Sequence, residues 1–198
     1  MPRVRKNDDY EAKSQAIMDC AAVLFAKEGF PSAKMQDVAK ACGATKSMLY
    51  HYFPTKDDLL FAMLKEHLER VISGLEEAVT TPGTARDRLH ALVLTFTQKS
   101  IQSRRRHMVA MQDVKYLPRA KQVPLNELQR RVVDLVAQVL RELNPHLPEE
   151  AYKPYTMMLI GVLNWTDVWY RPGGPIKQAE LSERIARLFL RGFLAEKS

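Results

Sequence analysis

Apolar residues recur at intervals of three and four along nearly the whole chain, and this period restricts the fold more than any other feature. Such spacing places side chains on one face of an α-helix. The first run of this kind is carried by Ile17, Cys20, Ala21 and Leu24. No stretch alternates apolar and polar residues between hairpin turns, so a sheet has no evident source. The pattern predicts an all-α chain with about nine helices.

Glycine, proline and capping residues mark where the predicted helices end. Gly29 closes the first helix. Thr45 is placed to cap a short helix that Pro54 stops. The later helices are predicted at residues 56–75, 86–101, 104–117, 125–143, 149–170 and 177–193. Pro124 is expected to separate two of these helices, and Pro154 to delay or kink another.

The composition is that of an ordinary globular protein with a modest excess of positive charge. The 30 Lys and Arg against 23 Asp and Glu give a formal net charge of +7. This charge is compatible with nucleic-acid binding without establishing it. Two cysteines cannot build a disulfide scaffold, and the longest apolar stretch is too short to cross a bilayer. We therefore expect a cytoplasmic protein with no membrane partner.

Residues 33–53, AKMQDVAKACGATKSMLYHYF, carry the most specific pattern. Two short helices joined by a tight turn at Gly43 form a helix-turn-helix. Its small core is predicted from Val38, Ala39 and Leu49. The second helix exposes the donor groups of Lys46, Ser47, Tyr50, His51 and Tyr52. Because no acidic residue lies between Lys40 and Lys56, this helix suits the major groove of DNA. The alternative is a pair of ordinary short helices whose tyrosines belong to the core.

The run from Gly29 to Leu60 resembles the DNA-binding region of the TetR family of bacterial transcriptional regulators. The resemblance rests on Gly29-Phe30, Met35, Asp37-Val38-Ala39, Gly43, Leu49 to Phe53 and Lys56 to Leu59, in that order. It implies an N-terminal three-helix DNA-binding domain at residues 1–54. It also implies a larger helical domain at residues 55–198, which binds an effector and forms a homodimer.

The same resemblance implies which side chains contact DNA. It places Lys46 and His51 at base edges, and it places Thr45, Tyr50, Tyr52 and Lys56 among the remaining contacts, mainly to the phosphate backbone. Where the family commonly has a threonine before its second helix, this chain has Ser32-Ala33-Lys34. Ser32 is therefore expected to cap that helix and is a candidate phosphate contact. A basic arm of Arg3, Arg5 and Lys6 either lies against DNA or is a frayed terminus.

Two later segments resemble one branch of the family. Residues 155–175, YTMMLIGVLNWTDVWYRPGGP, and the arginine-rich residues 104–117 look like the TetR-type repressors of phenylacetate and steroid-ring catabolism. Members of that branch leave DNA when they bind acyl-coenzyme A thioesters. The resemblance therefore implies an aromatic or alicyclic acyl-CoA as the effector.

The residues around these segments are compatible with such an effector. Residues 99–121 hold seven basic side chains and one acidic one, a suitable seat for coenzyme A phosphates. Trp165 and Trp169 are expected to flank the acyl group, and Asn164 to bond the thioester carbonyl. The full set of candidate contacts is Met63, His67, Phe96, Arg104, Met108, Met111, Gln112, Tyr116, Asn164, Trp165 and Trp169. The alternatives are a solvated charged face and an aromatic stripe that belongs to the core or to an interface.

The last two helices are the candidate dimer interface, because the family resemblance places them in a four-helix bundle. The final helix carries an apolar stripe of Leu181, Ile185, Leu188 and Phe189. The alternative is that this stripe packs on its own domain. Trp169 has the dimer interface as a rival to its effector role.

No constellation for catalysis is present in the sequence. The five histidines form no two-histidine metal motif, and neither a phosphate-cradling glycine loop nor a serine nucleophile elbow occurs. We expect no enzyme, no metal site and no cofactor apart from the effector. The preferred function is a repressor that binds a palindromic operator in double-stranded DNA and is released by its effector. The alternatives are an efflux repressor that responds to a lipophilic drug and, less favoured, a helical enzyme.

Overall fold

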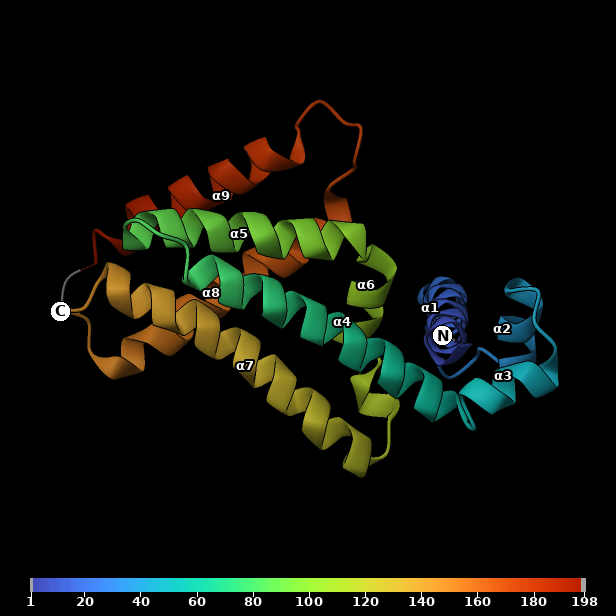
Figure 1. Cartoon of the computed structure of the whole chain (residues 1–198). Helices are drawn as coiled ribbons and strands as arrows, with labels where there is room; N and C mark the ends of the chain where they lie inside the picture. Colours follow the sequence, from blue (N-terminus) through green and yellow to red (C-terminus); the bar gives the residue numbers. More distant parts are fainter. Residues whose placement is uncertain (1, 197–198) are drawn as a thin grey trace. The chain divides into compact units, whose positions relative to one another are not determined.

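The computed structural model describes residues 2–196, with side chains from Asp9 onward, and every regular element in that range is helical (Figure 1). The elements are α1 (Pro2–Glu28), α2 (Met35–Ala41), α3 (Lys46–Tyr52), α4 (Lys56–Val79), α5 (Ala85–Gln102), α6 (Arg104–Gln112), the 3-10 turn η1 (Val114–Tyr116), α7 (Arg119–Leu143), α8 (Glu149–Trp169) and α9 (Gln178–Phe193). The all-α prediction is confirmed. None of the described helices has the length and apolar character needed to span a membrane.

The chain forms two compact units. The first contains Met1–His67 and Arg105–Asn126, and the second contains Leu68–Arg104 and Glu127–Ser198. The expected functional division at residues 54 and 55 therefore differs from the packing. The first unit takes in the start of α4, all of η1 and most of α6 in addition to α1, α2 and α3.

The helix-turn-helix packs as its sequence predicts. Val38, Ala39 and Leu49 are buried, with at most 4% of each side chain exposed. The Thr45 hydroxyl accepts the Met48 N–H at 3.1 Å and so caps α3. Gly43 has φ +65°, a left-handed conformation that suits glycine at the turn between the two helices. The two short helices are thus held by a small apolar core and one cap.

Two predicted helix boundaries are wrong. The helix predicted at 104–117 ends at Gln112 and is followed by the η1 turn. The next helix begins at Arg119, not after Pro124, because the Pro118 carbonyl already accepts the N–H groups of residues 121 and 122. Pro124 lies inside α7 and has no N–H to donate to the carbonyl of residue 120. Because residue 120 is exposed and close to the helix start, water can take the place of this donor.

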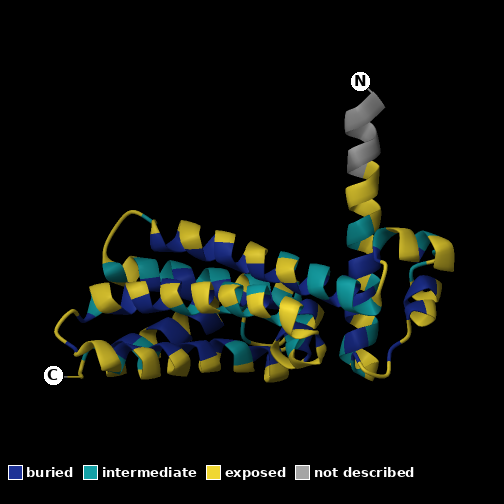
Figure 2. Cartoon of the chain, turned by 90° about the horizontal axis from the view of Figure 1, so that it is seen from below, coloured by how far each residue is buried: buried dark blue, intermediate teal, exposed yellow. Residues whose placement is uncertain are grey.

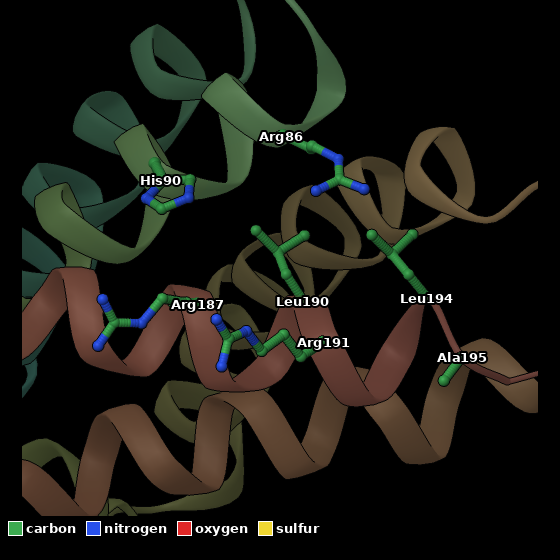
Figure 3. A pocket seen from close by; sticks show the side chains of 7 residues that line it. All are labelled: Arg86, His90, Arg187, Leu190, Arg191, Leu194 and Ala195. Atoms are coloured by element: carbon green, nitrogen blue, oxygen red, sulfur yellow. The ribbon is translucent and has the colours of Figure 1, made fainter.

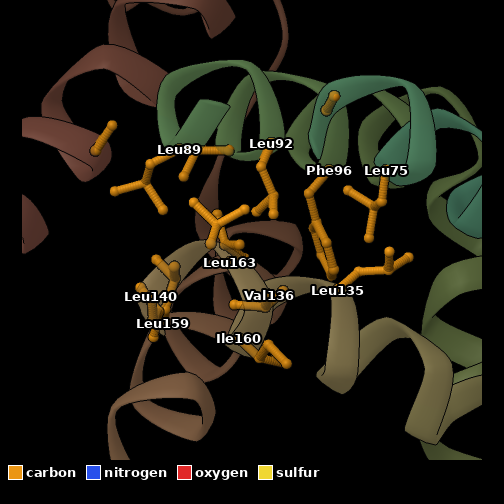
Figure 4. Packing of buried hydrophobic residues seen from close by; sticks show 14 of the residues in the cluster. Leu75, Leu89, Leu92, Phe96, Leu135, Val136, Leu140, Leu159, Ile160 and Leu163 are labelled. Atoms are coloured by element: carbon orange, nitrogen blue, oxygen red, sulfur yellow. The ribbon is translucent and has the colours of Figure 1, made fainter. Parts of the chain in front are cut away.

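The second unit is a helical bundle around one apolar core (Figure 4). The largest side chains of this core come from α4, α5, α7, α8 and α9, and they include Leu75, Leu92, Phe96, Val136, Leu163 and Phe193. Some buried polar groups are hydrogen-bonded across the bundle, whereas the Ser100 and Thr156 hydroxyls have no partner among the described residues. The Asn144 side chain donates to the Phe193 carbonyl at 3.1 Å, and the hydroxyls of Thr97 and Ser182 lie 2.7 Å apart. These bonds tie the end of α9 and its second turn to the neighbouring segments of the bundle.

Buried and exposed residues alternate in stripes along most helices (Figure 2). This is the arrangement expected of amphipathic helices that each bury one face. The exception is α8, whose outer face is also apolar, and this face is described below.

Candidate DNA-binding face and effector site

One face of α3 presents donor side chains and no acidic group. Thr45, Lys46, Ser47, Tyr50 and His51 are all exposed there. The Lys46 ammonium lies 5.9 Å from the centre of the Tyr50 ring, so both reach outward from the same turn of the helix. Since Leu49 fixes the opposite side of α3 in the core, this face can accept a phosphate or a base edge without rearrangement.

Tyr52 belongs to a packing contact as well as to the predicted DNA contacts. Its ring stacks on Tyr10 of α1, with ring centres 4.5 Å apart and an angle of 25° between the planes. The His51 ring meets Tyr10 edge-on at 6.5 Å. This aromatic cluster fixes the orientation of α3 against α1.

The predicted cap at Ser32 is wrong. Lys34 occupies the N-cap position of α2, without a side-chain hydrogen bond, and Ser32 lies exposed in the preceding turn. The N–H groups of residues 37 and 38 bond the Lys34 carbonyl, so α2 begins at Met35, three residues after the serine. Ser32 remains a candidate phosphate contact on grounds of exposure alone. The side chains of Arg3, Arg5 and Lys6 lie outside the described residues, although α1 spans their backbone.

Lys56 does not offer a free ammonium to DNA. Its Nζ donates to the carbonyls of Phe30 at 2.8 Å, Ala33 at 2.9 Å and Pro31 at 3.3 Å, and it lies 4.4 Å from the centre of the Phe30 ring. These bonds use all three protons of the ammonium. The predicted phosphate contact is therefore corrected to a structural one, in which α4 holds the turn between α1 and α2.

Replacing Lys56 by methionine is expected to lower the free energy of unfolding by about 2 kcal/mol, because three carbonyls lose a charged donor. Chemical denaturation measures this change. The matched control is Lys46→Met, which removes an exposed lysine on α3 and should leave stability within about 0.5 kcal/mol. A Lys56→Met protein with unaltered stability and weakened DNA binding would instead restore the phosphate-contact interpretation.

Arg106 joins three helices within the first unit. Its guanidinium, with 5% of the side chain exposed, donates to Glu66 of α4 at 2.8 Å and to Asp19 of α1 at 2.8 Å. It also donates to the Gln15 side chain at 3.1 Å. Beside it, the buried rings of His67 and His107 share a hydrogen bond of 3.0 Å. The sequence did not identify this network, because its members lie up to 91 residues apart and none of the partner residues stands in a recognisable motif.

The basic stretch at residues 99–121 is largely committed to internal contacts. Arg106 pairs with Asp19 and Glu66, as described above. Lys121 pairs with Asp58 and, together with Thr55, holds the pKa of that carboxyl below its usual range. Arg104 donates to the Tyr170 carbonyl at 3.4 Å and faces the Asp167 carboxylate. Three of the seven basic side chains in the predicted binding site for coenzyme A phosphates are therefore engaged in contacts within the protein.

The candidate effector contacts are divided between the two units. The first unit holds Met63, His67, Met108, Met111, Gln112 and Tyr116, and the second holds Phe96, Arg104, Asn164, Trp165 and Trp169. Met63, His67 and Phe96 are at most 2% exposed, whereas Met111, Trp165 and Trp169 are about half exposed or more. Neither unit alone brings the whole set together.

The outer face of α8 is an apolar stripe. Six large side chains on it are 48–64% exposed, namely Met157, Met158, Val162, Trp165, Val168 and Trp169. Gly161 lies on the same face, and Asp167 is the only ionisable residue between Pro154 and Trp169 apart from Tyr155. Contiguous exposed apolar surface of this kind marks an interaction site. We call it the α8 face.

The predicted dimer stripe of α9 is partly corrected. Leu181 and Ile185 are 6% and 8% exposed and belong to the core of the second unit, and Phe189 packs against that core. Only Leu188, which is 76% exposed, faces outward. The stripe therefore packs mainly on its own domain, as the alternative held.

Asp167 is buried on the inner side of α8, with 3% of the residue exposed. It lines a cavity of about 10 Å³ together with Ile101, Arg104 and Tyr170, among others. Burial raises the pKa of the Asp167 carboxyl to about 6, against the opposing pull of the Arg104 guanidinium. The folded protein therefore holds this proton more tightly than the unfolded chain does.

The Asp167→Asn variant is expected to reveal this titration. A raised pKa in the folded state contributes stability that is present below about pH 4 and lost as the pH rises through about 6. The wild type should therefore lose about 3 kcal/mol relative to the variant over this window, and no more above pH 7. Urea denaturation of both proteins between pH 3.5 and 7.5 measures the difference. If the unfolding free energies of the two proteins change in parallel with pH, folding does not raise the pKa of Asp167.

The sequence matches two models of known protein families and a curated relative. Residues 17–63 match the family described as bacterial regulatory proteins, tetR family, and residues 82–193 match the tetracyclin repressor-like, C-terminal domain. The HTH-type transcriptional repressor KstR2 of Mycobacterium tuberculosis is 25% identical over 91% of this chain and 92% of its own length.

Solved structures show the same fold. A TetR-family transcriptional regulator from Bordetella parapertussis superposes with a TM-score of 0.87 and is 30% identical, over 93% of this chain and 97% of that one. AibR, in complex with isovaleryl coenzyme A and operator DNA, has a TM-score of 0.75 at 20% identity, over 91% of this chain and 98% of its own. Both the helix-turn-helix and the larger helical region thus have counterparts, and the chain belongs to the TetR family of bacterial regulatory proteins.

Proposed function

We propose that this protein is a homodimeric transcriptional repressor that leaves a palindromic DNA operator when it binds an acyl-CoA thioester. The observation that carries the proposal is the acid-free donor face of α3, on which Lys46, Tyr50 and His51 are exposed beside a core fixed by Leu49. A rigid helix of this kind is what direct readout in the major groove requires.

The α8 face supports the dimer. Its six exposed apolar side chains, with Leu188 of α9, would be costly to leave in water. We assign Trp165 and Trp169 to this interface, in preference to the effector pocket, because both side chains are about half exposed or more and share the stripe. A two-fold dimer would present two α3 helices to half-sites about 34 Å apart.

The effector is proposed from relatives. KstR2 is named a transcriptional repressor, and AibR was solved with isovaleryl coenzyme A and operator DNA. Arg105 and Arg119, both exposed, remain available to an anionic ligand in the basic stretch. A repressor that responds to an uncharged lipophile is the second candidate, favoured by the internal pairing of Arg104, Arg106 and Lys121.

Fluorescence anisotropy on DNA from the region upstream of the protein's own gene tests the proposal. Isovaleryl-CoA, a steroid-derived acyl-CoA and an uncharged lipophile are added to the preformed complex. An acyl-CoA should weaken operator affinity about 5- to 150-fold, which corresponds to a coupling of about 1–3 kcal/mol. Free coenzyme A is the matched control for the acyl group. Release by the lipophile alone would replace the acyl-CoA with the second candidate, and binding that no compound affects would remove the proposed switch.

A further inference from the structure

A groove of about 440 Å³ lies on the second unit, between the start of α5 and the end of α9 (Figure 3). Grooves of this size are typical of small-molecule sites. Its lining consists of Arg86, His90, Arg187, Leu190, Arg191, Leu194 and Ala195. None of these residues belongs to the DNA-binding face or to the candidate effector contacts. We call it the α5–α9 groove.

Three guanidinium groups in the groove lack a counter-charge. Among the described residues, no carboxylate lies within ion-pair distance of Arg86, Arg187 or Arg191. The other two arginines of α5 and α9 are paired. Arg184 bonds Glu180 at 2.7 Å, and Arg88 bonds Glu142 at 2.6 Å. The unpaired arginines are therefore a local feature of the groove rather than a general property of these helices.

Two neighbouring carboxylates, one on α9 and one on α5, are hydrogen-bonded to other groups. Glu183 pairs with His90 at 2.8 Å, and the Asp87 carboxylate accepts the Thr84 N–H and hydroxyl, both at 2.7 Å, in the cap of α5. Arg86 also lies in the first turn of α5, where the helix dipole adds positive potential. Among the described residues, the three guanidinium groups of the groove therefore have no carboxylate in direct contact, although Asp87 and Glu183 keep their negative charge nearby.

The wall between the arginines is apolar. Leu190 is buried at 5% exposure, and Leu194 and Ala195 continue the same surface beyond the end of α9 (Figure 3). Guanidinium groups match phosphate oxygens with paired hydrogen bonds, and three of them match the charge of a diphosphate better than that of one carboxylate. The adjoining apolar surface suits a flat ring.

From this arrangement we propose that the α5–α9 groove binds the diphosphate group of a nucleotide, with the three unpaired arginines as its ligands. The diphosphate could belong to a free nucleoside diphosphate or to the nucleotide end of coenzyme A, which share this chemistry. The proposal does not depend on operator binding or on acyl-CoA release.

Isothermal titration calorimetry at constant ionic strength tests the site with sodium pyrophosphate, ADP, free coenzyme A and succinate. Pyrophosphate should bind the wild type at one site per chain, and the Arg187→Gln/Arg191→Gln variant should bind it at least about tenfold more weakly. The matched control is Arg184→Gln on the same helix, which should stay within about twofold of the wild type. Light scattering and thermal melts verify that the variants keep the wild-type fold and oligomeric state.

The ADP and coenzyme A arms identify the source of the diphosphate. Tighter binding of ADP than of pyrophosphate, abolished by Leu194→Ser, would place a nucleoside against the apolar wall. Tighter binding of coenzyme A than of ADP would assign the groove to the longer nucleotide end of coenzyme A. Failure of pyrophosphate to bind, equal binding to the double variant, or equal binding of succinate would overturn the site. None of these results bears on the operator experiment, so the two proposals can fail separately.

Discussion

Replacing Trp165 by aspartate is expected to give monomers in place of the proposed dimer and to abolish operator binding at nanomolar concentration. Trp165 is 64% exposed in the middle of the α8 face, with apolar neighbours on both sides. In a two-fold interface each substitution acts twice, so two carboxylates would enter an apolar contact. A loss of about 4 kcal/mol, typical of a central aromatic anchor, corresponds to nearly a thousandfold weaker association. Sedimentation velocity and anisotropy measure the two effects.

Val123→Asp is the matched control for this substitution. Val123 is 46% exposed on α7 and lies outside the α8 face, so its replacement should leave both dimer and operator binding intact. The assignment of the α8 face would be contradicted by a Trp165→Asp protein that remains a dimer. A dimer that keeps operator binding but no longer responds to its effector would return Trp165 to the effector site, as the sequence predicted.

Replacing Arg106 by methionine is expected to destabilise the first unit by about 2–4 kcal/mol. Methionine keeps much of the apolar stem and removes the charge that Glu66 and Asp19 face. Only 23% of the Glu66 side chain is exposed, so its carboxylate would stay partly buried without the guanidinium, whereas Asp19 is 70% exposed and can be solvated. The same network links α1, α4 and α6, so the loss should spread over all three helices.

Hydrogen exchange of the amides of α1, α4 and α6 reports this effect locally, and denaturation reports it globally. Arg105→Met removes the exposed neighbouring arginine and should change stability by less than about 0.5 kcal/mol. Asp19→Asn should cost less than Arg106→Met because of its exposure. Equal protection in Arg106→Met and wild type would mean that the network does not hold the unit together.

Local signals in the sequence were enough to predict the helix-turn-helix. The turn glycine, the cap at Thr45 and the buried positions of Val38, Ala39 and Leu49 all act over a few residues, and each is confirmed. The prediction that Pro124 separates two helices was wrong, because a proline near the start of a helix costs one hydrogen bond at most and does not end the helix.

The roles of charged residues could not be predicted in the same way. Lys56, Arg106 and Lys121 form pairs with residues 23 to 91 positions away, and a basic run in sequence does not reveal such partners. For a related reason, the sequence could not show which of the apolar stripes on α8 and α9 faces the core and which faces outward. Both helices carry apolar stripes, and only packing decides that Leu181 and Ile185 face the core while Trp165 faces outward.

The most direct test of the central claim is the affinity of wild type and Tyr50→Ala for operator DNA, measured by anisotropy at fixed salt. Tyr50 is 40% exposed on α3 and supports no core contact, so its removal should leave melting temperature and dimer unchanged. We predict that Tyr50→Ala binds operator DNA at least about tenfold more weakly, because one or more contacts are lost at each of two half-sites. Unaltered affinity of Tyr50→Ala, and of Lys46→Ala and His51→Ala measured beside it, would contradict the claim that α3 reads DNA.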